Sequence, residues 1–223
     1  MQPCMSSISK PAPSSSGRKC KGKGHERREE ILCVAQRLFV EEGYARTTIR
    51  RIASELGLCS TVLYLYFPDK GAILEEICAS TFAKLARECR ELRASGQDPV
   101  ANLHAATSGY IRFGLEHPQE YLLTFNQPAQ AAQPAKDAEP DNDPGCCAYA
   151  SFRALVEDVV AAEPTDPAVA IEVLTQCLWA GMHGLIMLQL TKPGFPWAER
   201  DELIQKHVTL LCEGLLQSAS AKA

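Results

Sequence analysis

The sequence predicts an all-α protein of about nine helices, in which a small three-helix unit with a helix-turn-helix precedes a larger helical domain. Hydrophobic residues make up 46% of the chain and recur at three- and four-residue spacing in one segment after another, which is typical of helices with one buried face. Runs of Val, Ile and Thr that would favour strands are scarce. No apolar run reaches about 18 residues, and the N-terminus lacks an apolar signal core. We therefore expect no membrane span and a cytoplasmic protein.

Charge divides the chain into a basic head and an acidic body. Through Lys70 there are 12 lysines and arginines against 7 acidic residues, a net charge of +5; from Gly71 onward there are 11 against 20, a net charge of −9. Residues 1–24 have almost nothing to bury, so we expect a disordered basic tail. The tail is either solvated or an arm that touches phosphates or a minor groove. A basic head suits a nucleic-acid contact at one end, although charge imbalance also serves solubility.

The first helix is expected from Glu26 to Glu42. Its apolar residues fall on one face, and Gly43 ends the pattern. This helix should support the two short helices that follow it, because three helices around one small core form the minimal unit of this kind.

The stretch Thr47–Lys70 reads as helix, glycine turn, helix. Thr48 is a good N-cap, and Gly57 stands where a left-handed C-cap would end the first helix. A second helix starts at Cys59 or Ser60 and ends near Tyr66, because the residue before a proline disfavours α geometry. This is the sequence form of a helix-turn-helix.

The motifs T-T-I-R-R-I-A-x-x-L-G-L and L-Y-x-Y-F-P-D-K within this stretch resemble the DNA-binding half of TetR/AcrR-type transcriptional regulators. The resemblance implies a DNA-binding domain at residues 25–70 and a ligand-binding and dimerisation domain at residues 71–223. Two positions depart from the pattern: Cys59 stands where a capping serine is common, and Leu65 where a polar residue is common. These departures affect the expected operator sequence rather than the fold.

Candidate DNA contacts follow from side-chain direction and from the resemblance. Arg50 is the best candidate for base readout, because a guanidinium can make two hydrogen bonds to guanine. Thr48, at a helix N-terminus, suits a phosphate, and Lys70 is expected to clamp one. Tyr64 and Tyr66 have core packing as their alternative. The full set of predicted DNA-binding residues is Thr48, Arg50, Ser60, Thr61, Tyr64, Leu65, Tyr66 and Lys70.

Six further helices are expected in the body. Asp98–Pro99 is a cap followed by proline at a first helical position, so a helix starts there, and residues 127–145 read as a mobile loop. The helices are expected at residues 71–92, 99–117, 118–125, 146–162, 168–190 and 198–218.

The segment Trp179–Leu185, W-A-G-M-H-G-L, resembles the C-terminal half of a TetR-type subfamily marked by Trp-x-x-x-His-Gly. The last two helices carry apolar faces that suggest a homodimer interface, and Gly181 and Gly184 would permit close helix approach. An ordinary intramolecular core is the alternative.

An effector pocket is the second candidate site. A lone histidine on an apolar helix, such as His183, is more often a core or interface residue than a ligand contact. Aromatic residues at helical spacing are also core residues by default. The candidates for a mostly apolar pocket are Tyr110, Phe113, Tyr121, Phe125, Phe152, Trp179, His183 and Met187.

Ten cysteines are present, but they form no C-x-x-C pair and no metal-finger spacing with histidine. We expect neither a metal nor a cofactor. Inert reduced thiols are the first interpretation, and redox or metal sensing through Cys146 and Cys147 is the alternative.

These expectations combine into a DNA-binding transcriptional regulator, most simply a homodimeric repressor released from a palindromic double-stranded operator by an unidentified small apolar or aromatic effector. The resemblance implies a bacterial, nucleoid-associated protein without a membrane. Paired carboxylates at a shared site, a nucleophile–histidine arrangement and a phosphate-binding loop are not recognisable in the sequence. An enzyme is therefore not expected.

Overall fold

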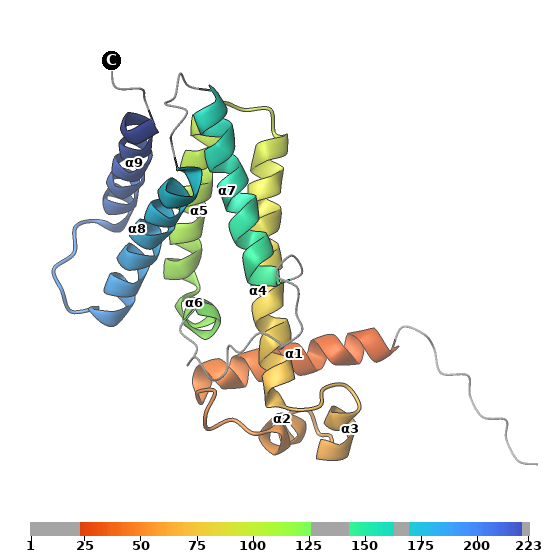
Figure 1. The fold of residues 1–223 in the computed structure, drawn as a ribbon. Helices are drawn as coiled ribbons and strands as arrows, with labels where there is room; N and C mark the ends of the chain where they lie inside the picture. The colour runs from red at the N-terminus through yellow and green to blue at the C-terminus, as the bar shows by residue number, and fades with distance from the viewer. Residues whose placement is uncertain (1–22, 126–142, 163–169, 220–223) are drawn as a thin grey trace, which may run out of the picture.

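The computed structural model describes residues 23–125, 143–162 and 170–219 (Figure 1). This part of the chain contains nine helices and no strand, which confirms the predicted all-α fold. Most of the predicted tail (1–24) and of the predicted loop (127–145) lies outside the described residues. The helices are α1 (Lys23–Glu41), α2 (Ile49–Glu55), α3 (Ser60–Tyr64), α4 (Lys70–Ala94), α5 (Pro99–Glu116), α6 (Pro118–Phe125), α7 (Pro144–Ala162), α8 (Ile171–Thr191) and α9 (Arg200–Ala219).

Local capping chemistry sets the helix ends. The Thr48 hydroxyl accepts a hydrogen bond from the Arg51 amide at the start of α2, and Asp98 caps α5 in the same way, with proline in the first helical turn. Gly57 has φ +66°, a left-handed conformation that glycine adopts without steric cost, so the chain can turn from α2 into α3. Cys59 occupies the cap position of α3 but makes no side-chain capping bond.

A first hydrophobic cluster, here called the reader core, joins α1–α3 to the beginning of α4. Figure 1 shows these three helices gathered around one end of the long α4. A single residue of α6, Leu123, also belongs to it. Its buried members are Ile31, Ala35, Leu38, Phe39, Ile49, Ile52, Ala53, Leu63, Phe67, Ile73, Leu74, Ile77 and Leu123.

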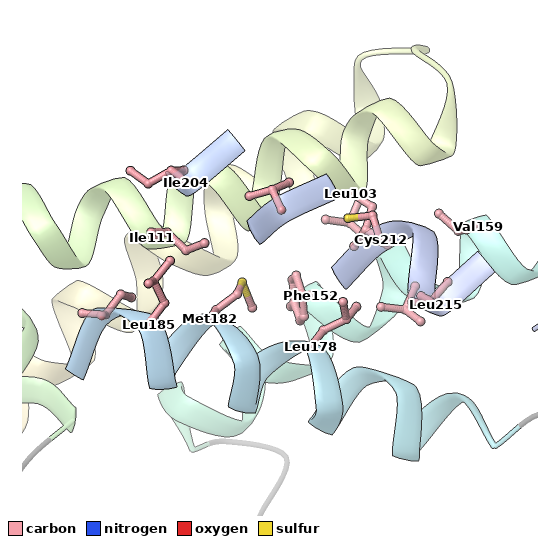
Figure 2. Close-up of a cluster of buried hydrophobic side chains, with 14 of the residues drawn as sticks. Leu103, Ile111, Phe152, Val159, Leu178, Met182, Leu185, Ile204, Cys212 and Leu215 are labelled. Carbon is pink, nitrogen blue, oxygen red and sulfur yellow. The ribbon is translucent and has the colours of Figure 1, made fainter. Parts of the chain in front are cut away.

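A second cluster, here called the body core, fills the space between α5, α6, α7, α8 and α9 (Figure 2). Gly114 of α5 permits a close approach to α8, since a Cβ atom there would lie 2.8 Å from Ile186. A Cβ atom on Gly181 would lie 2.7 Å from Leu211 of α9, whereas nothing lies within 4 Å of Gly184. Gly181 therefore serves helix packing within the chain.

The helix α4 contributes to both clusters. Ile73, Leu74 and Ile77 lie in the reader core, and Cys89, three turns further on, packs against the body core. Beyond the reader core α4 packs along α7, as Figure 1 shows. The division of the chain at residue 70 remains a prediction; α4 begins there and runs continuously into the body.

The helix α8 has two apolar faces with different surroundings. Leu178, Met182 and Ile186 are buried in the body core, whereas Val173 and Leu188 are more than half exposed. By length and composition alone, α8 is the one helix in the described segments that is apolar enough to cross a membrane, and 28% of its apolar window is buried. The buried residues of α8 pack in the body core.

Candidate nucleic-acid interface and effector cavity

The outer surface of α2 and α3 carries most of the predicted DNA contacts. Thr48, Arg50 and Thr61 are exposed, and Ser60 is half-buried. At the end of α3, the side chains of Tyr64 and Leu65 are 56% and 79% exposed. Two large apolar side chains side by side in solvent are unusual at the tip of so small a domain, and such exposure often marks a contact surface.

Arg50 differs from the other arginines of residues 24–70. It makes no hydrogen bond or ion pair with any described residue, so its guanidinium is available to a partner. The side chain of every other arginine in this segment has a protein acceptor. Arg27 pairs with Glu30, Arg28 with Glu76, Arg37 with Glu41 and Glu55, and Arg51 with Glu42 and Glu55, while Arg46 donates to the carbonyl oxygen of Glu42.

Two predicted contact residues are held by the protein itself. The Lys70 ammonium donates to the carbonyl oxygens of Tyr44 at 2.6 Å and Thr47 at 2.9 Å, and lies 4.1 Å from the centre of the Tyr44 ring. Burial lowers the pKa of Lys70. The ammonium has three donors, so one remains for a phosphate. Tyr66 is half-buried against the reader core, and its carbonyl oxygen accepts a hydrogen bond from Arg28.

The body contains a cavity of about 740 Å³ enclosed by residues of α4, α5, α6, α7 and α8. Its wall is mainly apolar and aromatic, as is usual for small-molecule sites. Five of the eight predicted pocket residues line it: Tyr110, Phe125, Phe152, Trp179 and His183.

Three predicted pocket residues lie elsewhere. Phe113 and Met187 pack against the body core away from the cavity, and Tyr121 is fully buried behind its wall. The prediction missed the contribution of α4 and the first turns of α7, including Phe82, Leu85, Leu92 and Tyr149. Periodicity identified the apolar face of α4, but it does not distinguish a face that meets a cavity from one that meets another helix.

A chain of side-chain hydrogen bonds connects two walls of the cavity. The Trp179 indole donates to the Tyr110 hydroxyl at 3.1 Å, this hydroxyl lies 3.1 Å from that of Tyr121, and the Tyr121 hydroxyl contacts Nδ1 of His183. Burial lowers the pKa of His183 and raises the pKa of both tyrosines. The chain is therefore neutral near pH 7, and Nε2 of His183 remains available to a ligand.

Two family models match the sequence. That for bacterial regulatory proteins of the tetR family matches residues 31–77, which contain the helix-turn-helix, and that for the tetracyclin repressor-like C-terminal domain matches residues 103–211. The chain belongs to the TetR family. The resemblance of Thr47–Lys70 to this family is thereby confirmed, whereas membership of the Trp-x-x-x-His-Gly subfamily remains a prediction.

Curated TetR-type relatives match part of the chain. The HTH-type transcriptional repressor KstR2 of Rhodococcus jostii (strain RHA1) is 38% identical over 92 residues, which are 41% of this chain and 45% of that protein. KstR2 of Mycobacterium tuberculosis (strain ATCC 25618 / H37Rv) is 29% identical over 115 residues, which are 51% and 57% of the two chains. The chain thus spans about half the length of these curated relatives.

Solved structures share the fold over nearly the whole chain. The fatty acid degradation regulator FadR from Bacillus halodurans has a TM-score of 0.69 at 14% identity, covering 87% of this chain and 97% of that one. The ketosteroid transcriptional regulator KstR2 of Mycobacterium tuberculosis has a TM-score of 0.56 at 16% identity, covering 88% of this chain and 96% of that one. At these identities the likeness concerns the TetR-family fold alone.

Nothing in the contacts or in the TetR-family comparisons supports a redox- or metal-sensing role. Cys146 and Cys147 are exposed at the start of α7, and no group of three or more metal-ligating side chains occurs within the described ranges. Burial raises the pKa of Cys78, Cys89 and Cys212 to about 11, so these three thiols carry little of the reactive thiolate near pH 7.

Proposed function

We propose that this TetR-family protein is a homodimeric DNA-binding repressor that leaves a palindromic operator when a small apolar or aromatic effector occupies the cavity. Its predicted partners are double-stranded DNA, a second copy of the chain and the effector, and its predicted place is the bacterial cytoplasm, at the nucleoid. It acts as a regulator rather than as an enzyme.

The free guanidinium of Arg50 supports the DNA-binding part of the proposal more than any other observation. It is exposed, like Thr61, Tyr64 and Leu65, on the helix-turn-helix, the unit that docks against a DNA major groove. Arg27, Arg28, Arg37 and Arg51 are paired with carboxylates, and Arg46 is held by a backbone carbonyl oxygen, so these arginines stabilise the domain. Arg50 is therefore the residue to which we assign base readout.

The uncovered apolar face of α8 supports the homodimer. Val173 and Leu188 on α8 and Leu210 on α9 are each more than half exposed. This exposure is unusual for a helix as apolar as α8, which has a mean hydropathy of 1.3 over its apolar window. A second copy would bury this face, and a two-fold axis between the copies would match a palindromic site.

The cavity supports regulation by a small molecule. Its wall includes Phe125 of α6, and the same short helix places Leu123 in the reader core. An occupant that moves α6 or α4 would therefore change the packing around the helix-turn-helix. Such a coupling between two sites is the physical content of allostery.

The test uses a duplex recovered by selection from random DNA with the purified protein. Arg50→Ala should weaken binding to that duplex by about tenfold or more, because a bidentate arginine–guanine contact contributes about 1–3 kcal/mol. Arg112→Ala removes the same charge from an exposed arginine on α5, paired with Asp201, and should bind normally. Unchanged affinity of Arg50→Ala in a gel-shift titration would refute the assignment.

A further inference from the structure

The charged residues that line the cavity all carry the same sign. Glu88 of α4 and Asp143, next to the start of α7, are lining residues, and no lysine or arginine is among the described residues of the wall. Glu88 makes no hydrogen bond or ion pair with any described residue. Asp143 uses Oδ1 to accept from the Cys146 amide at 2.8 Å, which leaves its second oxygen for a ligand.

Arginines on α4 and α7, two of the helices that line the cavity, are engaged by other groups. Arg153 reaches Glu157 at 2.9 Å and Glu172 at 3.3 Å, and Arg93 pairs with Asp158. Arg90 donates to the Ser151 hydroxyl. None of these guanidinium groups lines the cavity, so an anionic ligand inside it would meet two carboxylates and no positively charged side chain among the described residues.

Aromatic rings cover much of the remaining wall. Six phenylalanine, tyrosine and tryptophan side chains from five helices line the cavity, and two of them, Phe82 and Phe125, pack edge to face with centroids 5.4 Å apart. Aromatic faces attract organic cations through the ring quadrupole. The neutral hydrogen-bond chain that ends at His183 adds no positive charge to the wall.

We propose that the cavity selects lipophilic organic cations, such as aromatic amines or quaternary ammonium compounds, over anions of the same shape. The aromatic part of the ligand fills the apolar wall, and Glu88 and Asp143 neutralise its charge. This inference rests on the proposed function because it takes the cavity to be the effector site. It goes further by naming the charge class of the effector.

The experiment compares three naphthalene probes that differ in charge: the (2-naphthylmethyl)trimethylammonium cation, 2-naphthalenemethanol and 2-naphthoate. Binding to the full chain without DNA is measured by calorimetry at low and at high salt. The cation should bind about tenfold more tightly than the alcohol, and the anion most weakly. High salt should reduce the difference, since salt screens charges that water can reach.

The double variant Glu88→Gln, Asp143→Asn tests which residues cause the preference. Asparagine keeps an oxygen that can cap α7, so the helix start is preserved. The variant should bind the cation and the alcohol within about twofold of each other. The matched control is Glu91→Gln, one turn along α4 at an exposed position paired with Arg87, and it should keep the full preference.

Three results would overturn the inference: an anion that binds as tightly as the cation, a preference that survives in the double variant, or no binding of any probe. These results are independent of the DNA assay. If the protein binds its selected duplex but shows no preference for the cation, this inference is refuted and the proposed function is not. If the protein prefers the cation but does not bind DNA, the proposed function is refuted and the charge preference of the cavity is not.

Discussion

Tyr121 holds the wall of the cavity in place from behind. Its ring is fully buried in the body core, and its hydroxyl connects Tyr110 of α5 to His183 of α8. A buried hydroxyl without a partner would cost about 1–3 kcal/mol, so the two contacts fix both neighbours as well as the tyrosine. His183 consequently presents one ring nitrogen to the cavity while the other is occupied.

The burial of His183 predicts a pH dependence of stability. Burial lowers the pKa of His183 in the folded chain, while an unfolded histidine has a pKa of about 6.5. As the pH falls through about 6.5 the unfolded state therefore takes up the proton first, and the free energy of unfolding decreases. This decrease should be visible in urea titrations between about pH 7 and about pH 5.

His183→Gln removes this titration and should flatten the decrease. Parallel pH profiles for the wild type and His183→Gln would contradict the assigned cause.

Some residues of the site were predictable because their chemistry is local. Thr48 and Asp98 cap helices within three residues of themselves, and Gly57 supplies a left-handed turn. Lys70 was less predictable, because its two carbonyl acceptors belong to the α1–α2 turn, more than twenty residues away. Which arginines of this segment are paired, and that Arg50 is left without a described partner, depends in the same way on how α1, α2 and α4 meet.

At the scale of the helix, α6 shares with α4 the property of placing residues in both hydrophobic clusters. Leu123 lies in the reader core, Tyr121 in the body core and Phe125 on the cavity wall. The carboxylate of Glu120 on the same helix contacts Thr81 and Lys84 of α4. The eight residues of α6 thus face three environments, because the side chains along a helix point in different directions around its axis.

Two helical glycines, one in the contact between α5 and α8 and one on the surface of α9, should respond in opposite ways to replacement by alanine. Gly114→Ala places a Cβ atom 2.8 Å from Ile186 and should cost about 1–3 kcal/mol by overpacking. Gly214→Ala, on α9 with nothing within 4 Å of the added atom, should stabilise by about 0.5–1 kcal/mol, because alanine is the better helix former. Urea denaturation measures both, and a stabilising Gly114→Ala would refute the close packing.

Helix periodicity predicted each helix of the described chain but only part of the cavity wall. Phe113 and Phe125 both follow a helical apolar pattern, yet only Phe125 reaches the cavity. Phe82 and Leu85 of α4 also line the cavity, and nothing in the sequence pattern of residues 71–92 distinguishes them from residues that contact another helix. Whether a face meets a neighbour or a gap depends on how five helices are placed together, and no local pattern contains that information.

At the scale of the molecule, the apolar face left uncovered on α8 leads to a prediction about assembly. Leu188→Glu places a charge on a side chain that is 53% exposed, so it should leave the monomer folded and separate the proposed dimer. Analytical ultracentrifugation should show a shift to half the mass. Leu65→Glu, at a position 79% exposed in the helix-turn-helix, should keep the mass of the wild type. A dimeric Leu188→Glu would exclude this face as the interface.

The continuity of α4 has a consequence for unfolding. Because one uninterrupted helix supplies Ile73, Leu74 and Ile77 to the reader core and then packs along α7, neither core can melt without fraying the other. Leu123 of α6 is a second connection between the body and the reader core. Heat should therefore dissolve both cores in one cooperative transition, with no surviving half-molecule.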